Sequence, residues 1–268
     1  MQEKDVTYAG PNGPVSGRLV VPDGRGPHPA LIVVHEIWGL DDHIRGVARR
    51  FAEQGYLSLA PDLYTGELHE AMTPANIMAG MQFLRQAPPE VQRDPSRLAE
   101  RMAQFTPEQQ RAMRTLMEVM GPRRREGFAQ DLRAALGYLR GRDDVDPARV
   151  GCLGFCMGGG LTGRLATIAP ELRAGVIFYG ENPPLDEVPR IQGALLGLYG
   201  ETDRRITDTV PDLARAMARA GKPFEYHVYP GAAHAFFNDT RPSYQAEAAQ
   251  QAWERVLAFL GRELGHAA

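Results

Sequence analysis

Short apolar runs recur along the chain, separated by segments with helical periodicity. The run at residues 30–34 is entirely apolar, which is typical of a strand buried on both faces of a sheet. Pro22 and Pro61 directly follow two of the runs, as expected where a strand ends. The pattern predicts strands at residues 17–21, 30–34, 56–60, 150–153, 174–178, 194–199 and 224–229.

The segments between these strands show the spacing of amphipathic helices. Positions i, i+3, i+4 and i+7 of one helix are occupied by Ile44, Val47, Ala48 and Phe51. Asp41 or Asp42 is expected to cap this helix and Gly55 to end it. Comparable stripes predict helices around residues 128–139, 210–217 and 253–264. Strands alternating with helices of this length predict an α/β fold, with a mainly parallel sheet covered by helices on both faces.

Residues 64–125 interrupt this alternation and predict a helical insertion. Thr73 and Thr106 each precede a proline, which is the pattern of an N-cap residue followed by proline at the first helical position. Thr106 and Gln109 also have the spacing of a capping box. Methionines are concentrated here, which suits either a cap that moves over a pocket or an additional helical pair packed on the sheet. No repeat or linker divides the chain, so residues 1–268 are expected to form one domain.

Composition and charge argue against several classes of protein. The 268 residues carry a net charge of -3, which argues against a generally basic nucleic-acid binder. The N-terminus has no apolar run like that of a secretory signal, and no apolar stretch reaches the roughly 18 residues that a membrane span needs. The two cysteines lie four positions apart, which argues against a disulfide framework, so a reducing, cytoplasmic location is expected.

The segment Gly154-Phe-Cys-Met-Gly158 lies between a predicted strand and a glycine-rich helix start. This is the G-x-S-x-G arrangement of a nucleophile elbow, with cysteine in the serine position. A nucleophile on such a strained turn needs glycine neighbours to avoid steric clashes. The pattern predicts Cys156 as a nucleophile and the amide of Met157 as an oxyanion donor. The alternative is that Cys156 is a buried structural cysteine, an interpretation that fits Cys152 well.

Two polar residues follow later strands in the order that an elbow of this kind requires. Asp203 follows the strand at 194–199, and His234 follows the strand at 224–229. Asp203 would orient His234, and His234 would take or hold the proton of the Cys156 thiol. Taken alone, Asp203 could instead cap the next helix, and His234 could be a surface histidine.

The loop after the strand at 30–34 holds Glu36 and Ile37. The amide of Ile37 is the expected second oxyanion donor. A carboxylate near Cys156 would oppose thiolate formation and raise the pKa of the thiol. Glu36 is therefore predicted to modulate the thiol, the alternative being a surface glutamate at a strand end.

Six segments, in chain order HEIWG, APDLY, GFCMGG, FYG, GETD and GAAHAF, resemble the dienelactone hydrolase family of the α/β-hydrolase fold. The resemblance extends from about residue 15 to about residue 260. It implies a catalytic triad of Cys156, Asp203 and His234, with the amides of Ile37 and Met157 forming the oxyanion hole.

The same resemblance implies that Glu36 contacts the resting, protonated thiol, that substrate displaces it, and that the freed carboxylate then helps to generate the thiolate. Trp38 and Tyr179 match positions that line the family's pocket, and Phe236 and Asn238 are expected to line it as well. Family members that act on chlorocatechol-derived lactones hold the substrate carboxylate with two arginines.

This sequence departs from that arginine pattern. Asn238 occupies one arginine position, and the nearest arginine is Arg241. Arg111 and Arg114 are both possible counterparts of the other. The chemistry is therefore expected to be retained while the preference for a substrate carboxylate stays open.

These features predict a hydrolase, similar to carboxymethylenebutenolidase, that cleaves a carboxylic ester or lactone through a cysteinyl acyl-enzyme. The alternatives are a general carboxylesterase or thioesterase acting on neutral substrates, and a redox-sensing or ligand-binding thiol protein. The histidines lack metal-ligand spacing and no separate phosphate-binding glycine motif follows a strand, so neither metal nor cofactor is expected. The expected partner is a small-molecule substrate, with no nucleic acid or membrane.

Overall fold

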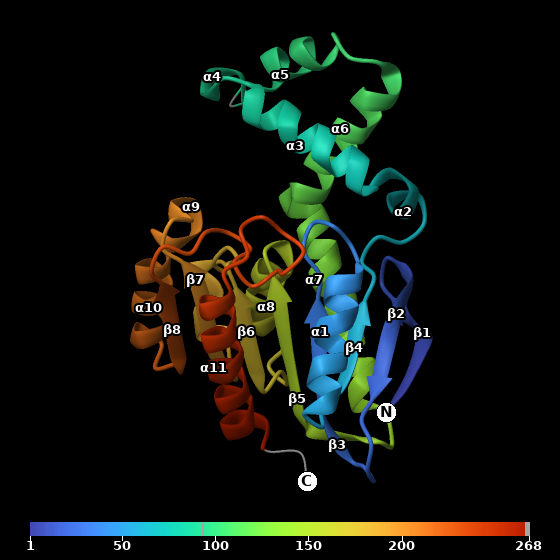
Figure 1. The fold of residues 1–268 in the computed structure, drawn as a ribbon, viewed down its shortest axis with the longest axis vertical. Helices are drawn as coiled ribbons and strands as arrows, with labels where there is room; N and C mark the ends of the chain where they lie inside the picture. The colour runs from blue at the N-terminus through green and yellow to red at the C-terminus, as the bar shows by residue number, and fades with distance from the viewer. Residues whose placement is uncertain (93, 266–268) are drawn as a thin grey trace. The chain divides into compact units, whose positions relative to one another are not determined.

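The computed structural model describes residues 1–92 and 94–265, which contain a sheet of eight strands (Figure 1). The strands are β1 (Gln2–Gly10), β2 (Gly13–Val21), β3 (His28–Val34), β4 (Leu57–Pro61), β5 (Val145–Phe155), β6 (Ala174–Phe178), β7 (Ala194–Gly200) and β8 (Phe224–Tyr229). Their order across the sheet is β1-β2-β4-β3-β5-β6-β7-β8. Strand β2 pairs antiparallel with β1 and β4, and all other neighbours are parallel.

The predicted strands are confirmed, and the bounds of β6 and β8 are those predicted. Strand β5 extends beyond its predicted range at both ends. Strand β1 was not predicted, because all but one of its side chains are exposed or half-buried and the strand lacks an apolar run. It pairs with β2 along its whole length as an edge hairpin.

Helices cover both faces of the sheet (Figure 1). Helices α1 (Asp42–Glu53) and α11 (Ala246–Leu264) share one apolar cluster with strand residues that include Leu153. Helix α8 (Met157–Ile168) lies on the opposite face, because its Thr162 hydroxyl contacts the thiol of Cys152 at 3.4 Å and successive strand residues point to opposite faces. The predicted mainly parallel sheet between two helical layers is confirmed.

The predicted cap of α1 is present. The Asp41 side chain accepts a hydrogen bond from the Ile44 amide, and Gly55 follows the helix with a φ of 86°. Three shorter elements and the end of a longer one complete this part of the chain: η1 (Leu185–Arg190), α9 (Arg204–Thr207), α10 (Val210–Arg219), and residues 128–140 of α7 (Pro122–Arg140).

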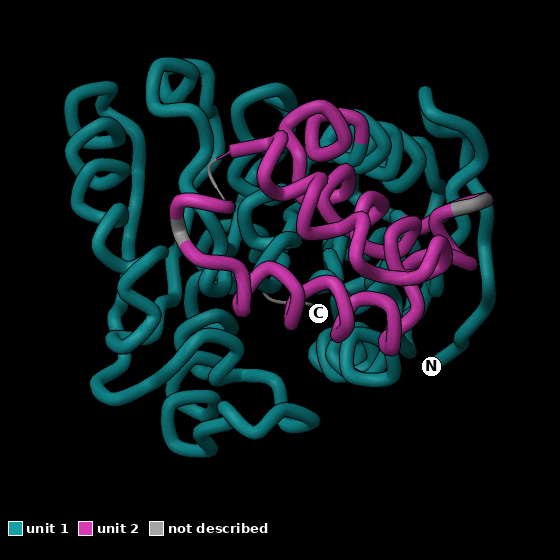
Figure 2. Tube along the Cα trace, turned by 90° about the horizontal axis from the view of Figure 1, so that it is seen from above, with its two compact units in different colours: residues 1–63, 128–268 teal, residues 64–127 magenta. Residues whose placement is uncertain are grey.

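Residues 64–127 form a second compact unit, distinct from the unit made of residues 1–63 and 128 onward (Figure 2). Its helices are α2 (Glu67–Ala71), α3 (Pro74–Gln86), α4 (Pro89–Gln92), α5 (Pro95–Met102) and α6 (Pro107–Met120). Thr73 caps α3, and Thr106 and Gln109 form the predicted capping box of α6. The helical insertion is thus present, while a single domain and a mobile cap both stay predictions.

Packing within this unit explains part of its methionine content. Phe83, Met102 and Met113 form its buried apolar cluster. Helices α3 and α6 approach closely at Gly80, where an added Cβ would lie 2.6 Å from the Leu116 side chain. Methionine suits such an irregular interior because its side chain adapts to the available space. Within the described ranges, no helix is long and apolar enough to cross a membrane.

Candidate active site

Cys156 lies at the turn between β5 and α8, directly before the first residue of the helix. Its φ is 54°, in the left-handed region that side chains other than glycine rarely adopt. Such a conformation costs about 1–3 kcal/mol and persists only where the surroundings impose it. The Cys156 amide donates a 3.0 Å hydrogen bond to the carbonyl of Phe178, the last residue of β6. The turn is therefore anchored to the neighbouring strand.

The glycines on either side of Cys156 are required by close backbone contacts. A Cβ on Gly154 would lie 2.1 Å from the carbonyl oxygen of Gly158. A Cβ on Gly158 would lie 2.5 Å from the carbonyl oxygen of Val34, at the end of β3. The strand–turn–helix predicted from the glycine spacing is present, and it brings Cys156 to the carboxyl end of the parallel strands.

Asp203 and His234 follow β7 and β8 and meet at the same edge of the sheet. The Nδ1–H group of His234 donates to Oδ2 of Asp203 at 2.5 Å. Asp203 is also the N-cap residue of α9, but its side chain makes no capping hydrogen bond. Its carboxylate is 9% exposed and accepts a hydrogen bond from His234, not from the amides of α9. This argues against a role limited to capping the helix.

The side chain of Cys156 neighbours His234 and acts on the protonation of its imidazole. Burial lowers the pKa of His234, but the interactions with Asp203 and Cys156 outweigh this effect and raise it to about 10. The site therefore favours a protonated imidazole beside the sulfur, and a positive imidazolium stabilises a thiolate. The structure brings the three predicted residues together in the order thiol, imidazole, carboxylate.

Glu36 lies just beyond the end of β3 and is 2% exposed. The hydroxyl of Tyr179 donates to its Oε1 atom at 3.2 Å, and the side-chain amide of Asn238 donates to its Oε2 atom at 2.8 Å. Burial raises the pKa of Glu36 above its ordinary value, and the hydrogen bonds from Asn238 and Tyr179 offset only part of this rise. Glu36 is therefore a buried carboxylate with both oxygens engaged, not a surface residue at a strand end.

The expected contact between Glu36 and the thiol stays a prediction, and the carboxylate has other hydrogen-bond partners in this structure. In the described ranges, no hydrogen bond joins Glu36 to Cys156; the carboxylate is held by Tyr179 and Asn238. Tyr179 lies near both groups, because the charges of Glu36 and Cys156 each raise the pKa of its phenol, after burial as the main cause. Its ring centroid is 5.1 Å from that of His234. Tyr179 thus lies near all three groups.

The residues expected to line the pocket differ in exposure. Trp38 is half-buried, whereas Tyr179, Phe236 and Asn238 are fully buried. The ring of Phe236 packs against those of Tyr179 and Tyr229, so Phe236 supports the site from behind. In this conformation these three side chains do not form an accessible pocket wall, because neighbouring aromatic and polar groups cover them.

The three candidate arginines occupy different environments. The guanidinium of Arg241 stacks over the Trp38 ring, 4.1 Å from its centroid, and lies 3.8 Å from the Asp41 carboxylate. Arg111 and Arg114 are exposed residues of α6, in the unit of residues 64–127. Arg241 is therefore a residue of the sheet unit that already has an aromatic and an acidic neighbour.

The two predicted oxyanion donors belong to segments that end at the same sheet edge. Ile37 follows Glu36 after β3, and Met157 is the first residue of α8, where helical amides point outward. Two nearby histidines were not singled out from the sequence. His35 donates from Nδ1 to the Glu36 carbonyl at 2.5 Å and accepts from the Leu63 amide at 3.1 Å. His43, in the first turn of α1, donates from Nδ1 to Oδ1 of Asp239 at 3.0 Å.

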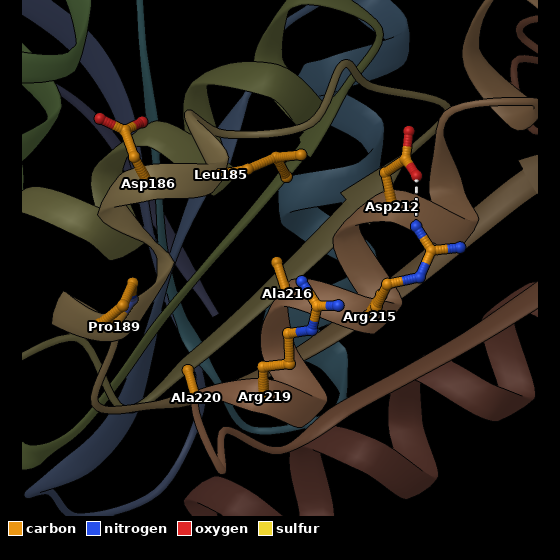
Figure 3. A pocket seen from close by; sticks show the side chains of 8 residues that line it. All are labelled: Leu185, Asp186, Pro189, Asp212, Arg215, Ala216, Arg219 and Ala220. Atoms are coloured by element: carbon orange, nitrogen blue, oxygen red, sulfur yellow. Dashed lines mark hydrogen bonds and ion pairs between the residues drawn. The ribbon is translucent and has the colours of Figure 1, made fainter.

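A separate cavity of about 440 Å³ lies between η1 and α10 (Figure 3). Asp212 and Arg215 form an ion pair of 2.9 Å on one side of it. None of the site residues described above lines this cavity, so it is not assigned to the chemistry of Cys156. Across the described part of the chain, no group of three or more His, Cys, Asp or Glu side chains is arranged to hold a metal ion.

Comparison with known proteins gives consistent similarities. The model of the dienelactone hydrolase family matches residues 15–264. The "Putative carboxymethylenebutenolidase" of Saccharolobus solfataricus is 38% identical over 261 residues, covering 97% of this chain and 98% of that protein. The protein with the same name from Methylorubrum extorquens is 32% identical, covering 91% of this chain and 76% of its own length.

Solved structures extend the similarity to the fold. A "Putative Dienelactone Hydrolase" from Klebsiella pneumoniae subsp. pneumoniae aligns with a TM-score of 0.71 at 29% identity, covering 97% of this chain and 98% of that one. A dienelactone hydrolase-like promiscuous phosphotriesterase from metagenomic libraries aligns with a TM-score of 0.74 at 23% identity, covering 98% and 99%. The latter similarity concerns the fold alone.

Proposed function

The chain belongs to the dienelactone hydrolase family, and we propose that it cleaves carboxylic esters or lactones through a covalent thioester on Cys156. It has the α/β-hydrolase fold and is a hydrolase that acts on ester or lactone bonds. The proposal concerns the residues that carry out the reaction. It rests above all on the line of contacts from the Cys156 side chain through His234 to Asp203.

Acylation begins when the sulfur of Cys156 attacks the substrate carbonyl carbon and its proton is held by His234. The electrons of the carbonyl π bond move to the oxygen, and in this proposal the amides of Ile37 and Met157 stabilise the resulting oxyanion. When the tetrahedral intermediate collapses, the C–O bond to the leaving alcohol breaks and the alkoxide takes the proton from His234. The products are a thioester and an alcohol, which for a lactone remains part of the same molecule.

Deacylation uses the same groups in reverse. His234 takes a proton from water, and the resulting nucleophile attacks the thioester carbonyl. The C–S bond then breaks, the carboxylic acid leaves, and the proton returns to the sulfur. Asp203 holds the imidazole in the tautomer that presents Nε2 to the sulfur, because its carboxylate accepts from Nδ1–H.

Glu36 opposes the thiolate of the resting enzyme in this proposal. Both of its oxygens accept hydrogen bonds, and in its ionised form the buried negative charge near Cys156 favours the neutral thiol. Tyr179 contacts Glu36 and lies near the sulfur, so a substrate that repositions Tyr179 would also change the effect of Glu36 on the thiol. The side chain therefore protects the thiol from oxidation between turnovers.

A panel of p-nitrophenyl esters and small lactones tests the function. We expect turnover by the wild-type protein and a covalent adduct, equal in mass to the acyl group, on the peptide that contains Cys156. The adduct should accumulate in His234→Gln if that variant retains any acylation. Absence of turnover on the whole panel, together with peroxide-sensitive oxidation of Cys156, would instead favour a redox function.

A further inference from the structure

The side-chain amide of Asn238 is held at both of its polar atoms, and the residue is fully buried. Its Oδ1 atom accepts from the backbone amide of Thr240 at 3.0 Å and from the Thr240 hydroxyl at 2.7 Å. Its Nδ2 group donates to Oε2 of Glu36 at 2.8 Å. Among the described residues, the Asn238 side chain has no further hydrogen-bond partner. Asn238 thus joins a loop threonine to the buried carboxyl group.

The two contacts from Thr240 determine which way the Asn238 amide faces. The oxygen and nitrogen of a side-chain amide have similar shapes, so the hydrogen-bonding neighbours decide which atom lies on which side. The backbone N–H of Thr240 can only donate, so the Asn238 atom that faces it is the oxygen. The hydroxyl donates to the same oxygen. The nitrogen therefore faces Glu36, and towards that residue it can only donate.

The backbone around Asn238 supports this arrangement independently of the Thr240 side chain. The backbone amide of Asn238 donates to the carbonyl of Ala235 at 3.1 Å, and its carbonyl accepts from the amide of Arg241 at 3.1 Å. The contact from Oδ1 to the amide two positions later is that of an Asx turn. The Thr240 side chain itself is exposed. Its hydroxyl can therefore be removed without opening the core.

The other oxygen of Glu36 lies towards the triad. Its Oε1 atom accepts from the hydroxyl of Tyr179 at 3.2 Å. The Tyr179 ring centroid is 5.1 Å from that of His234. The residue before it, Phe178, accepts from the backbone amide of Cys156 at 3.0 Å. The two carboxyl oxygens thus have different neighbours: an amide on one side, and on the other a phenol beside the proposed base and nucleophile.

These neighbours also distinguish the two places where a proton can bind. Burial raises the pKa of Glu36, so its carboxyl group takes up a proton at a higher pH than an exposed glutamate does. A protonated carboxyl group has one O–H donor and keeps a carbonyl oxygen as acceptor. Asn238 donates to Oε2, which favours Oε2 as that acceptor and Oε1 as the protonated oxygen. The Tyr179 hydroxyl can then accept from Oε1, since a hydroxyl serves as donor or acceptor.

Titratable groups surround Glu36 on several segments. Tyr179 follows β6, His234 follows β8, His43 belongs to α1, and His35 precedes Glu36 and contacts its backbone carbonyl. Within the part of the chain that the structure describes, Oε2 has a single hydrogen-bond partner, which is the Asn238 amide. Neutral substitutions at positions 238 and 240 leave every one of these charges in place. Their effect on Glu36 therefore reports the amide contact.

We propose that Thr240 is a positioning residue, which through the Asn238 amide fixes Oε2 of Glu36 as a hydrogen-bond acceptor and directs the carboxyl proton to Oε1, on the side of Tyr179. Thr240 thereby controls from which side Glu36 gains and loses its proton. It acts through Asn238 and has no part in the bonds that are made or broken. This role rests on the proposed function only in the step from the charge of Glu36 to turnover.

Substitution of Thr240 tests the proposal without adding a charge. Thr240→Val removes the hydroxyl and keeps the shape, Thr240→Ser keeps the hydroxyl, and Asn238→Leu removes the amide. The carboxyl ¹³C resonance of Glu36, identified by its loss in Glu36→Gln, reports its protonation. Loss of a donor to a carboxylate raises its pKa, so the midpoint should move up by about one pH unit in Asn238→Leu and about half of that in Thr240→Val. Thr240→Ser should titrate like the wild type.

The side on which the proton binds has its own readout. The ¹³Cζ resonance of Tyr179, identified by its loss in Tyr179→Phe, should shift at the pH at which Glu36 titrates, because the hydroxyl changes from donor to acceptor. Thr209→Val is the matched control, since it removes an exposed hydroxyl that donates to the carbonyl of Ile206. It should leave both resonances unchanged.

The outcomes separate this proposal from the proposed function. The proposal is wrong if Glu36 titrates at the wild-type pH in Thr240→Val, or if the Tyr179 resonance does not follow the Glu36 titration. The pH profile of kcat/KM for p-nitrophenyl acetate should move up with the carboxyl resonance in Thr240→Val and stay in place in Thr240→Ser. A shifted resonance with an unshifted profile would remove the link of Thr240 to the reaction. Absence of hydrolysis by the wild type would overturn the proposed function and leave the resonance tests in force.

Discussion

Asp203 stands at the N-cap of α9, yet its carboxylate accepts from Nδ1–H of His234 at 2.5 Å and makes no hydrogen bond to the helix. An aspartate at a helix start ordinarily accepts from the backbone amides of the first turn. Here the short helix forms without that contact, and the side chain is directed to a residue 31 positions later in the chain. The carboxylate is thus committed to orienting the imidazole.

Asp203→Asn should therefore impair turnover while leaving the fold intact. The amide oxygen can still accept from His234, but the loss of charge lowers the pKa of His234 and weakens the preference for the required tautomer. We expect kcat/KM for an ester to fall by about 10²–10⁴-fold. Asp208→Asn, at the other end of α9, is the matched control and should retain activity. Equal losses in both variants would show that α9 itself, not the orientation of His234, matters.

The two cysteines should behave oppositely. Cys156→Ala removes the proposed nucleophile and should reduce ester hydrolysis at least about 10⁴-fold, with a melting temperature near that of the wild type. Cys152 is fully buried, and burial raises the pKa of its thiol to about 12. Cys152→Ala should keep most of the activity at some cost in stability. Loss of turnover in folded Cys152→Ala, but not in Cys156→Ala, would refute the assignment.

Glu36→Gln tests the effect of the buried carboxylate on the thiol. Removing the negative charge should favour the thiolate form of Cys156 and speed its alkylation by iodoacetamide at pH 6 by about tenfold. The family resemblance implies that the displaced carboxylate helps His234 to generate the thiolate, and because a Gln amide cannot accept a proton, the value of kcat should fall. Glu53→Gln, on the exposed side of α1, is the control. An unchanged pH dependence of alkylation would refute a role of Glu36 in setting the state of the thiol.

The same substitution should also affect stability. Asn238 donates from Nδ2 to Glu36, and its Oδ1 atom already accepts from the amide and hydroxyl of Thr240. A Gln that accepts from Tyr179 would turn its own NH₂ group toward the NH₂ group of Asn238. The buried mismatch should cost about 1–3 kcal/mol of unfolding free energy, measured by urea denaturation alongside the alkylation assay.

Substrate charge can be examined with a matched pair of esters. A charge-assisted bidentate contact from arginine contributes about 1.5–3 kcal/mol. Asn238 occupies one of the two arginine positions, and its side chain is bound to Glu36. We therefore expect kcat/KM for mono-p-nitrophenyl succinate to exceed that for p-nitrophenyl butyrate by less than about tenfold. A larger preference for the anion would direct attention to Arg241, Arg111 and Arg114, each tested by substitution with Gln.

Much of the sheet was predictable because its central strands are apolar on both faces. Strands β6 and β8 have the predicted bounds, and strand-end positions alone placed Cys156, Asp203 and His234 at one edge. Strand β1 was missed because its polar, exposed side chains resemble those of a loop. Its formation depends on pairing with β2, which a local pattern does not reveal.

The surroundings of Glu36 were not predictable in the same way. Its partners Tyr179 and Asn238 lie 143 and 202 positions away in the chain and come from two separate strand-end segments. Phe236 and Asn238 are fully buried in this structure, so their expected place in a pocket wall stays a prediction. His43 directly precedes the apolar stripe of α1 in the sequence, and the structure buries it with that stripe.

Because Cys152 is buried, the reactivity of its thiol reports local opening of the native structure. Its sulfur lies under α8 against Thr162, whereas Cys156 is only partly buried at the turn. A small thiol reagent should modify Cys156 promptly in the native protein. It should modify Cys152 only when α8 separates from β5. The rate of that second reaction therefore measures how often this part of the interior becomes accessible under native conditions, without denaturant and without an added label.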